Sequence, residues 1–495
     1  MSWLPNDLTL SYPGGRPYYS ASKVETSDWP SCPVKVGIDA RRARVNGEAP
    51  EAPFDSLLVA SIKTAIDALI TGRRVDADTA LARAQATYAA RHPGIRAFLD
   101  TAMENYLDFI ESREAVVGPL TYRDFSHRRI VTSDFDVKMW APVFTDLNGR
   151  AEVHRLRYGK ARGDATEWAT AVAWIASNGM PATVFEVGLT AGLERVLLDS
   201  VAPEEVHRRF ESEVLPRLRE AHAATNPVAG SDCAECKAAP ACGALIHVDA
   251  FRGLRDSVAS VRALSASDLN RYRSCPASWY LRSMRLPSDA ATGEALERGA
   301  RVHEWIAERH VADEACTGAL ASAEGIEAGD MPMLRAHAEG CDRPEGRSIA
   351  VEETLVAWDD GAHLVLYLKP DELFVRGDTL VLREIKTTEK VILLDSETAA
   401  RDEYSDVLAW WLAVVRGGLA QHFGASRGEV ELEVLTPAGG VRYAFAADDP
   451  STDYLVEGWL LDVPDAWMND NSWLPNPGPR CADCTVARWC EFGNP

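Results

Sequence analysis

The cysteines constrain this chain more than any other residue type, because eight of the ten fall into two sets with the same spacing. The pattern C-x2-C-x5-C occurs twice, and each copy has a distant partner cysteine followed by proline. Cys32 lies 201 residues before the first trio, and Cys275 lies 206 residues before the second. The two quartets are Cys32, Cys233, Cys236 and Cys242, and Cys275, Cys481, Cys484 and Cys490. Landmarks repeated at this separation predict a chain built from two copies of one module.

Other segments repeat in the same order. SASKVETSDWPSCP precedes the first lone cysteine and SASDLNRYRSCP the second. EWATAVAW from Glu167 matches EYSDVLAW from Glu403 in helical spacing. FEVGLTAGLERVLL from Phe185 and LEVLTPAGGVRYAF from Leu432 each read as two strands about a turn. We therefore predict two tandem modules of α/β class, residues 1–250 and 251–495, joined near residues 253–263.

Composition and charge limit the cellular location and the kinds of partner that we expect for the protein. No run of about 18 apolar residues suggests a membrane span. The N-terminus lacks the basic start and apolar stretch of a signal peptide, so we expect a cytoplasmic protein without a membrane partner. In a reducing compartment, cysteines are more readily metal ligands than disulfides. The net charge of −22 argues against a surface that grips nucleic acid everywhere, although a local basic groove remains compatible with it.

Each trio forms an incomplete metal site. C-x2-C presents two thiolates on one turn, the third cysteine follows within reach, and a fourth ligand is needed. Cys275 is the natural fourth ligand of the second trio. The first trio has two candidates, Cys32 and His247, and the repeat favours Cys32. Four thiolates suit zinc and an iron–sulfur cluster equally well. Cys316 and Cys341 are expected to be plain thiols.

A set of polar residues between Cys275 and Cys481 predicts a second kind of metal site. LVLYLKPDELFV is expected to be one strand that carries Asp371, and a Gly-Asp turn leads to a second strand, TLVLREIK. Glu384 and Lys386, two residues apart on that strand, point to the same face. If Asp371 lies on the adjacent strand, two carboxylates and an amine converge. With His303 from the helix GARVHEWI, this set suits Mg²⁺ or Mn²⁺.

The order SASDLNRYRSCPASWYLR, GARVHEWI, KPDEL, REIKTT, helix and C-x2-C-x5-C resembles the RecB-type branch of the PD-(D/E)xK nucleases. It is most similar to the iron–sulfur members, the AddB-like nucleases and the CRISPR-associated RecB-like exonucleases. The resemblance implies a mixed central sheet flanked by helices in each module, and a 4Fe–4S cluster on Cys275, Cys481, Cys484 and Cys490. The first quartet is a candidate for a second cluster, and whether that module keeps one stays open. It also implies that His303, Asp371, Glu384 and Lys386 are catalytic with Mg²⁺ or Mn²⁺. The family's Gln-x3-Tyr pair is replaced here by Asp406 and Trp410.

The resemblance also implies a function: a DNase acting on single-stranded DNA or DNA ends in repair, recombination or anti-phage defence. No G-x4-G-K-[ST] loop for ATP is present, so any unwinding requires a helicase partner. The rival interpretations are a non-catalytic iron–sulfur DNA-binding scaffold and a zinc protein of regulatory type.

Two regions are candidates for DNA contact. Arg271 and Arg273 lie among Tyr272, Trp279 and Tyr280, which suit base stacking or a packed core equally. The first module shows no carboxylate pair in the matching hairpin from Ala141. It is therefore expected to be a degenerate copy, with a basic strand edge formed by Arg155, Arg157, Lys160 and Arg162.

Overall fold

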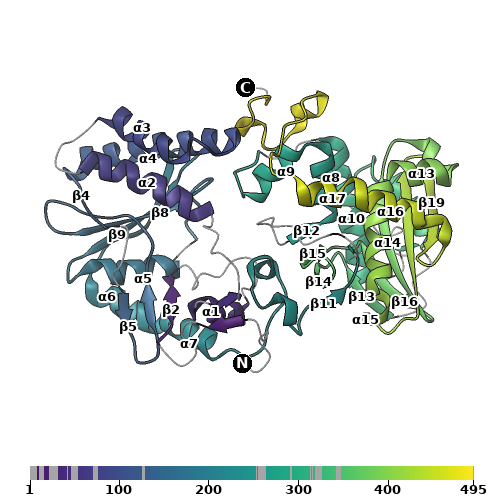
Figure 1. Ribbon diagram of the computed structural model, residues 1–495, viewed down its shortest axis with the longest axis horizontal. Coiled ribbons are helices and arrows are strands. Elements are labelled where there is room, and N and C mark those ends of the chain that lie inside the picture. The colour runs from purple at the N-terminus through teal and green to yellow at the C-terminus, as the bar shows by residue number, and fades with distance from the viewer. Residues whose placement is uncertain are drawn as a thin grey trace.

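The computed structural model describes residues 8–10, 16–21, 32–41, 43–45, 54–70, 76–124, 129–164, 166–251, 254, 263–289, 293–312, 314, 316–317, 326–341 and 347–493. These residues form two lobes (Figure 1). The first lobe contains the N-terminal half of the chain, and the second contains the C-terminal half. The expected joining segment, residues 253–263, lies almost wholly outside the described residues, as does most of SASKVETSDWPSCP.

The first lobe is built on a five-stranded sheet with the order β10-β9-β8-β7-β4. Small sheets β1-β3 and β2-β6-β5 accompany it. Its strands are β1 (Leu8–Leu10), β2 (Tyr18–Ser20), β3 (Ala43–Val45), β4 (Thr121–Asp124), β5 (Arg129–Val131), β6 (Asp136–Lys138), β7 (Val143–Thr145), β8 (Ala151–Arg157), β9 (Ala182–Gly188) and β10 (Leu193–Val201). Its helices are α1 (Pro33–Ala40), α2 (Phe54–Ile70), α3 (Ala77–Tyr88), α4 (Pro93–Val117), α5 (Thr166–Ser177), α6 (Pro203–Arg209) and α7 (Leu215–Ala223).

The second lobe has a five-stranded sheet, β13-β16-β17-β18-β19, and a four-stranded sheet, β11-β14-β15-β12. The strands are β11 (Ile246–Val248), β12 (Ala263–Ser265), β13 (Arg347–Val351), β14 (Leu355–Asp359), β15 (Leu364–Leu368), β16 (Glu372–Arg376), β17 (Thr379–Thr387), β18 (Arg427–Thr436) and β19 (Gly439–Ala446). The helices are α8 (Ala266–Ser274), α9 (Pro276–Ser283), α10 (Glu294–Val311), α12 (Met331–Gly340), α13 (Glu397–Glu403), α14 (Ser405–Val414), α15 (Ala420–His422), α16 (Asp453–Asp462) and α17 (Pro464–Asn469).

The two five-stranded sheets share one connection pattern. In the first lobe, β7 and β8 are antiparallel, β8 and β9 are parallel, and β9 and β10 are antiparallel. In the second lobe, β16, β17, β18 and β19 pair in the same sequence of directions. A helix, α5 or α14, crosses between the two parallel strands in each case. The expected hairpins are confirmed, and the two segments expected to be helical fall in α5 and in α13 and α14. The duplication that they suggest stays a prediction.

The lobes meet through their cysteine-bearing loops. Trp489, beside the last cysteine, packs against Phe98 on α4 with ring centroids 5.5 Å apart, where the yellow C-terminal segment approaches α4 in Figure 1. The loop of the first trio packs in turn against Val356, Trp358 and Val365 of the second lobe. Strand β11, from the last residues of the expected first module, pairs in parallel with β14. Each trio is therefore covered by the other half of the chain.

Two local expectations were wrong. LVLYLKPDELFV is two strands rather than one, because the chain leaves β15 at Leu368 and enters β16, in a different sheet, at Glu372. Pro370 lies between them, and proline cannot donate a ladder hydrogen bond. EYSDVLAW is likewise split at Tyr404, between α13 and α14. Within the described part of the chain, every helix is too short or too polar to cross a membrane.

Candidate metal-dependent active site

The hairpin of β16 and β17 brings together three of the four predicted catalytic residues. Gly377, with φ of +64°, opens the two-residue turn between the strands, a conformation that glycine adopts without strain. Glu372 pairs with Arg383, so Asp371 stands next to Glu384 at the end of the ladder. Asp371 Oδ2 accepts the backbone N–H of Ile385 at 2.5 Å. Lys386 Nζ donates to Glu384 Oε1 on the same strand.

The fourth predicted residue, His303, reaches this hairpin from α10. Its Nδ1 lies 3.3 Å from Asp371 Oδ1. The sequence did not single out Glu352, whose Oε1 lies 3.1 Å from the same nitrogen. His303, Glu352 and Asp371 each offer one ligand atom, and these atoms all lie within 4.8 Å of one another.

The backbone holds Glu352 in an uncommon conformation. Its φ is +50°, in the left-handed region that non-glycine residues seldom occupy. Its backbone N–H donates to the carbonyl of Asp371 at 3.1 Å, and Lys369 Nζ lies 2.6 Å from its Oε2. Strain of this kind persists where surrounding contacts enforce it and is concentrated at functional sites. A glutamate outside any spaced motif gives no sequence signal, which is why Glu352 was missed.

The charges of the site depend on one another. Burial alone would lower the pKa of His303, but hydrogen bonds to Asp371 and Glu352 and their negative charges raise it to about 9. Burial and the charge of Asp371 raise the pKa of Glu384. Burial would lower the pKa of Lys386, yet the charges of Glu384 and Asp371 raise it and keep the ammonium protonated. The carboxylates that retain a proton on His303 would equally attract a divalent cation.

Helix α14 supports the hairpin through Trp411. The indole Nε1–H of Trp411 donates to Glu384 Oε2 at 2.8 Å, and this bond is buried. The neighbouring Trp410 points into the core, where its ring packs against Phe251 with centroids 5.7 Å apart. Asp406, at the place of the family's glutamine, forms an ion pair with Arg273. The helix therefore contacts the site through Trp411, a residue that the sequence motif did not mark.

The second cysteine quartet lines a single pocket with Ser278, Pro475 and Val486 among its walls. Two backbone N–H groups point at sulfur: that of Asn476 donates to Cys275 Sγ and that of Gly478 to Cys481 Sγ, both at 3.4 Å. Cys484 and Cys490 complete the set. The four cysteines that the spacing grouped therefore line one pocket. Their role as ligands of one metal group stays a prediction.

The first quartet lines an equivalent pocket. Again two N–H groups point at sulfur, from Val228 to Cys32 Sγ and from Gly230 to Cys233 Sγ, both at 3.4 Å. Burial raises the pKa of Cys236 to about 11. The alternative ligand His247 is not part of this pocket; its Nδ1 lies 3.1 Å from Asp360 Oδ1 on an exposed surface. Cys32, rather than His247, therefore lies with the first trio around this pocket.

The spacing of the sulfurs bears on what each quartet can hold. Among the described residues, neither quartet has three sulfurs within 4.8 Å of one another. One zinc ion with thiolates at about 2.3 Å would bring tetrahedral sulfurs to about 3.8 Å. A cluster of several iron atoms is larger than one ion and separates its thiolates further.

The predicted DNA-contact residues have mixed positions. Tyr272 and Trp279 are buried, so they belong to the core rather than to a stacking surface. Tyr280 stacks on Trp473 with ring centroids 5.5 Å apart. Arg273 remains largely exposed beside Asp406. Arg271 is half-buried, and burial together with the charge of Arg282 lowers its pKa.

The first lobe has a different chemistry on the matching strand. Arg155 and Arg157 of β8 lie 3.4 and 2.6 Å from Glu186 Oε1, and Glu186 is fully buried. The backbone N–H groups of Arg162 and Gly163 donate to its other oxygen. The expected basic strand edge is thus partly neutralised from within, because a buried carboxylate engages Arg155 and Arg157, whereas Lys160 and Arg162 are exposed.

Comparison with known proteins finds a family model that matches the second lobe. Residues 263–491 match a family model described as the PD-(D/E)XK nuclease superfamily. Such a domain suggests a nuclease that uses divalent metal ions such as Mg²⁺ to hydrolyse nucleic acid. No curated protein matches the chain. A solved structure described as "Crystal structure of SSO0001" aligns at 15% identity over 48% of this chain and 90% of that chain, with a TM-score of 0.24. At that score the likeness adds nothing to the assignment.

Proposed function

We propose that the second lobe is a metal-dependent DNA nuclease that cuts single-stranded DNA or DNA ends. The observation that carries the proposal is the convergence of His303, Glu352 and Asp371 within 4.8 Å, beside Glu384 and Lys386 on the adjacent strand. One nitrogen and several carboxylate oxygens form a ligand set suited to Mg²⁺ or Mn²⁺.

His303, Asp371 and Glu384 are the proposed ligands. The bound cation would act as a Lewis acid on a scissile phosphate and lower the pKa of a water molecule. Lys386, kept protonated by its carboxylate neighbours, orients that water and stabilises negative charge on the phosphate oxygens. Glu352 shares the His303 Nδ1 contact with Asp371 and is a further candidate ligand, and Trp411 fixes the orientation of the Glu384 carboxylate.

We assign a 4Fe–4S cluster to each cysteine quartet, with zinc as the alternative. The sulfur spacing supports the larger group, and backbone N–H groups directed at sulfur are a feature that tunes such clusters. Each cluster would tie together segments about 200 residues apart, since Cys32 precedes Cys233, and Cys275 precedes Cys481, by roughly that distance.

The first lobe is proposed to be a non-catalytic copy that serves as a scaffold or DNA-binding arm. With a net charge of −22, contact with DNA is expected along a restricted track that includes Arg271 and Arg273. Repair, recombination or defence against foreign DNA is the proposed setting, with a helicase or another DNA-processing protein as partner.

The test is cleavage of end-labelled single- and double-stranded DNA with Mn²⁺ by oxygen-free protein. Wild type is compared with Asp371→Ala, Lys386→Ala and Glu352→Ala. Matched controls are Asp378→Ala, in the exposed hairpin turn, and Lys390→Ala, whose ammonium pairs with Glu403 at the surface. Metal-dependent cutting that is lost in Asp371→Ala and Lys386→Ala, but retained in both controls, would support the assignment.

Two outcomes would contradict it. If wild type binds DNA but does not cut it with any divalent metal tested, the non-catalytic scaffold becomes the better account. If Asp371→Ala cuts as fast as wild type, the activity arises elsewhere.

A further inference from the structure

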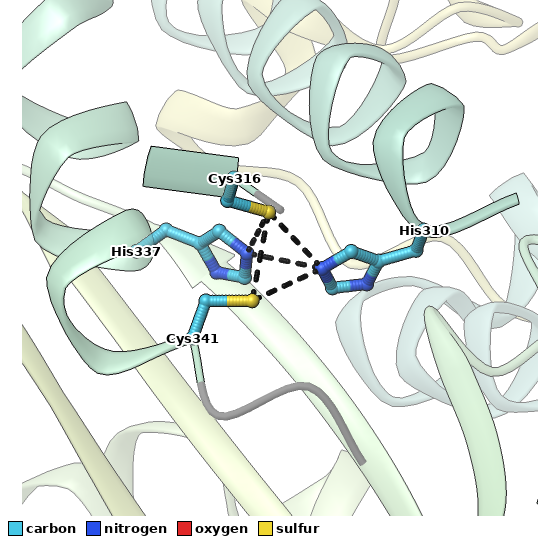
Figure 2. Close-up of side chains that lie close together, drawn as sticks. All are labelled: His310, Cys316, His337 and Cys341. Atoms are coloured by element: carbon cyan, nitrogen blue, oxygen red, sulfur yellow. Dashed lines mark hydrogen bonds between the residues drawn. The ribbon is translucent and has the colours of Figure 1, made fainter. Parts of the chain in front are cut away.

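Four side chains with metal-binding atoms come from α10, from α12 and the residue after its end, and from the segment between the two helices, and none belongs to a cysteine quartet. They are His310, Cys316, His337 and Cys341, and their ligand atoms all lie within 4.8 Å of one another. Figure 2 shows the two imidazoles and the two thiols pointing at one common centre. Cys316 and His337 are buried, and the His310 side chain is only 4% exposed. Two cysteines predicted to be plain thiols are thus part of one cluster.

The spacing of these atoms is that of ligands around one tetrahedral ion. His310 Nε2 lies 3.4 Å from each of Cys316 Sγ, Cys341 Sγ and His337 Nε2. Cys316 Sγ lies 3.5 Å from Cys341 Sγ and 3.7 Å from His337 Nε2. Zinc bonds of about 2.3 Å to sulfur and 2.0 to 2.1 Å to nitrogen place tetrahedral ligands about 3.3 to 3.8 Å apart. In the two cysteine quartets, by contrast, no three sulfurs of the described residues lie within 4.8 Å of one another.

The other nitrogen of each imidazole faces a buried carboxylate. His337 Nδ1 lies 3.0 Å from Glu433 Oε1, and His310 Nδ1 lies 3.4 Å from Glu372 Oε1. A carboxylate accepts hydrogen bonds, so the hydrogen of a neutral His337 ring sits on Nδ1. The carboxylate of Glu372 favours the same tautomer of His310 by its charge, without a hydrogen bond. The lone pair of Nε2 is then directed at the two sulfurs. Without a cation, only the weak S–H donors of the two thiols would stand among these four atoms. A carboxylate behind a metal-bound histidine is a common arrangement.

These carboxylates are held in place by arginines of the same sheet face. Arg383 is fully buried between Glu372 and Glu431, at 2.8 Å from each. Arg442 lies 3.5 Å from Glu433, and Arg376 lies 3.0 Å from Glu431. Because arginines balance the glutamates, the imidazoles are not required there as cations. They are free to serve as neutral ligands.

The geometry points to a structural zinc site formed by His310, Cys316, His337 and Cys341. Four protein ligands close the coordination sphere, so the site has no open position for a substrate. The ion would join α10 and α12 to the segment containing Cys316, over the face of the sheet that carries Arg383. His303 lies on α10 seven residues before His310, about two helical turns. The zinc would thus fix the helix that delivers His303 to the proposed active site.

The experiment measures metal content and coordination in the full-length protein, purified without oxygen. We expect about one zinc per chain by mass spectrometry, and a zinc X-ray absorption spectrum that fits two sulfur and two nitrogen ligands. The double variant Cys316→Ala/Cys341→Ala should lose this zinc. The control His422→Ala, which alters an exposed histidine on α15, should keep it. Glu433→Gln should weaken zinc affinity about 10- to 100-fold, because it removes the charge behind His337.

Each alternative outcome is informative. A four-sulfur shell would place the zinc in a cysteine quartet and overturn the assignment, as would retention of zinc in the double variant. If that variant does not fold, cobalt exchanged into wild type gives the same answer, because tetrahedral cobalt with two thiolates has intense visible bands. Wild type that contains no zinc and binds neither metal refutes the site. These readouts do not require nuclease activity, so they are independent of the proposed function.

Discussion

Replacing Trp411 by phenylalanine tests whether Glu384 must be held in one orientation for metal binding. The change removes the indole N–H that donates to Glu384 Oε2 at 2.8 Å and keeps most of the apolar ring. A buried hydrogen bond to a charged group contributes about 1.5 to 3 kcal/mol. At 1.4 kcal/mol per factor of ten, its loss corresponds to a weakening of Mn²⁺ affinity of about 10- to 150-fold. The rate at saturating Mn²⁺ should fall much less, because Trp411 acts through Glu384.

Trp410 provides a matched control on the same helix. It is fully buried, and its indole nitrogen has no hydrogen-bond partner among the described residues. Trp410→Phe therefore loses similar volume without touching Glu384. Calorimetric titration of Mn²⁺ gives the affinity, and the Mn²⁺ dependence of cleavage gives the half-saturating concentration. An unchanged affinity in Trp411→Phe, or an equal change in Trp410→Phe, would refute the reasoning.

Three further predictions concern stability and metal content. Arg383→Met should lower the free energy of unfolding by about 3 to 5 kcal/mol, since it leaves two buried glutamates without their shared cation. The control Arg427→Met should be nearly neutral, because Arg427 pairs with Asp378 at the exposed surface. Hydrogen exchange of β17 measures both effects, and equal effects would contradict the prediction. Burial, only partly offset by Glu152, lowers the pKa of His154 below 6.5, so the unfolded chain binds a proton that the folded protein does not. The free energy of unfolding should therefore fall as the pH drops below 6.5, and urea titrations of His154→Gln should show a smaller fall. Cys275→Ser should remove about half of the iron and of the visible absorbance, and unchanged iron would exclude Cys275 as a ligand.

The sequence predicted the parts of the site that follow from local geometry. Glu384 and Lys386 share a face because strand residues alternate, and the Gly-Asp turn places Asp371 beside them. The cysteine quartets could be recognised in the sequence because their spacing occurs twice. His303 was found from its place in an ordered set of motifs and lies on the expected helix.

The remaining residues depend on tertiary contacts that leave no local pattern. Glu352 reaches His303 only because its backbone adopts a positive φ. His310 and Cys316 come from different segments than His337 and Cys341, and their spacing matches no familiar zinc motif. His337 and Cys341 are four residues apart at the end of α12, and this was the one signal that favoured a metal site. The sequence also predicted one strand across Pro370, because apolar residues lie on both sides of it, whereas the structure has two strands there.

Two consecutive carboxylates, Asp371 and Glu372, serve different parts of the molecule. Asp371 contacts His303, whereas Glu372 turns to the opposite side, toward Arg383 and His310. A slip of one residue in the pairing of β16 with β17 would exchange their directions. It would leave Arg383 facing the wrong side chain and would disturb both metal sites at once. The ions would therefore act as a check on folding fidelity, because only the correct alignment of this hairpin can bind both of them.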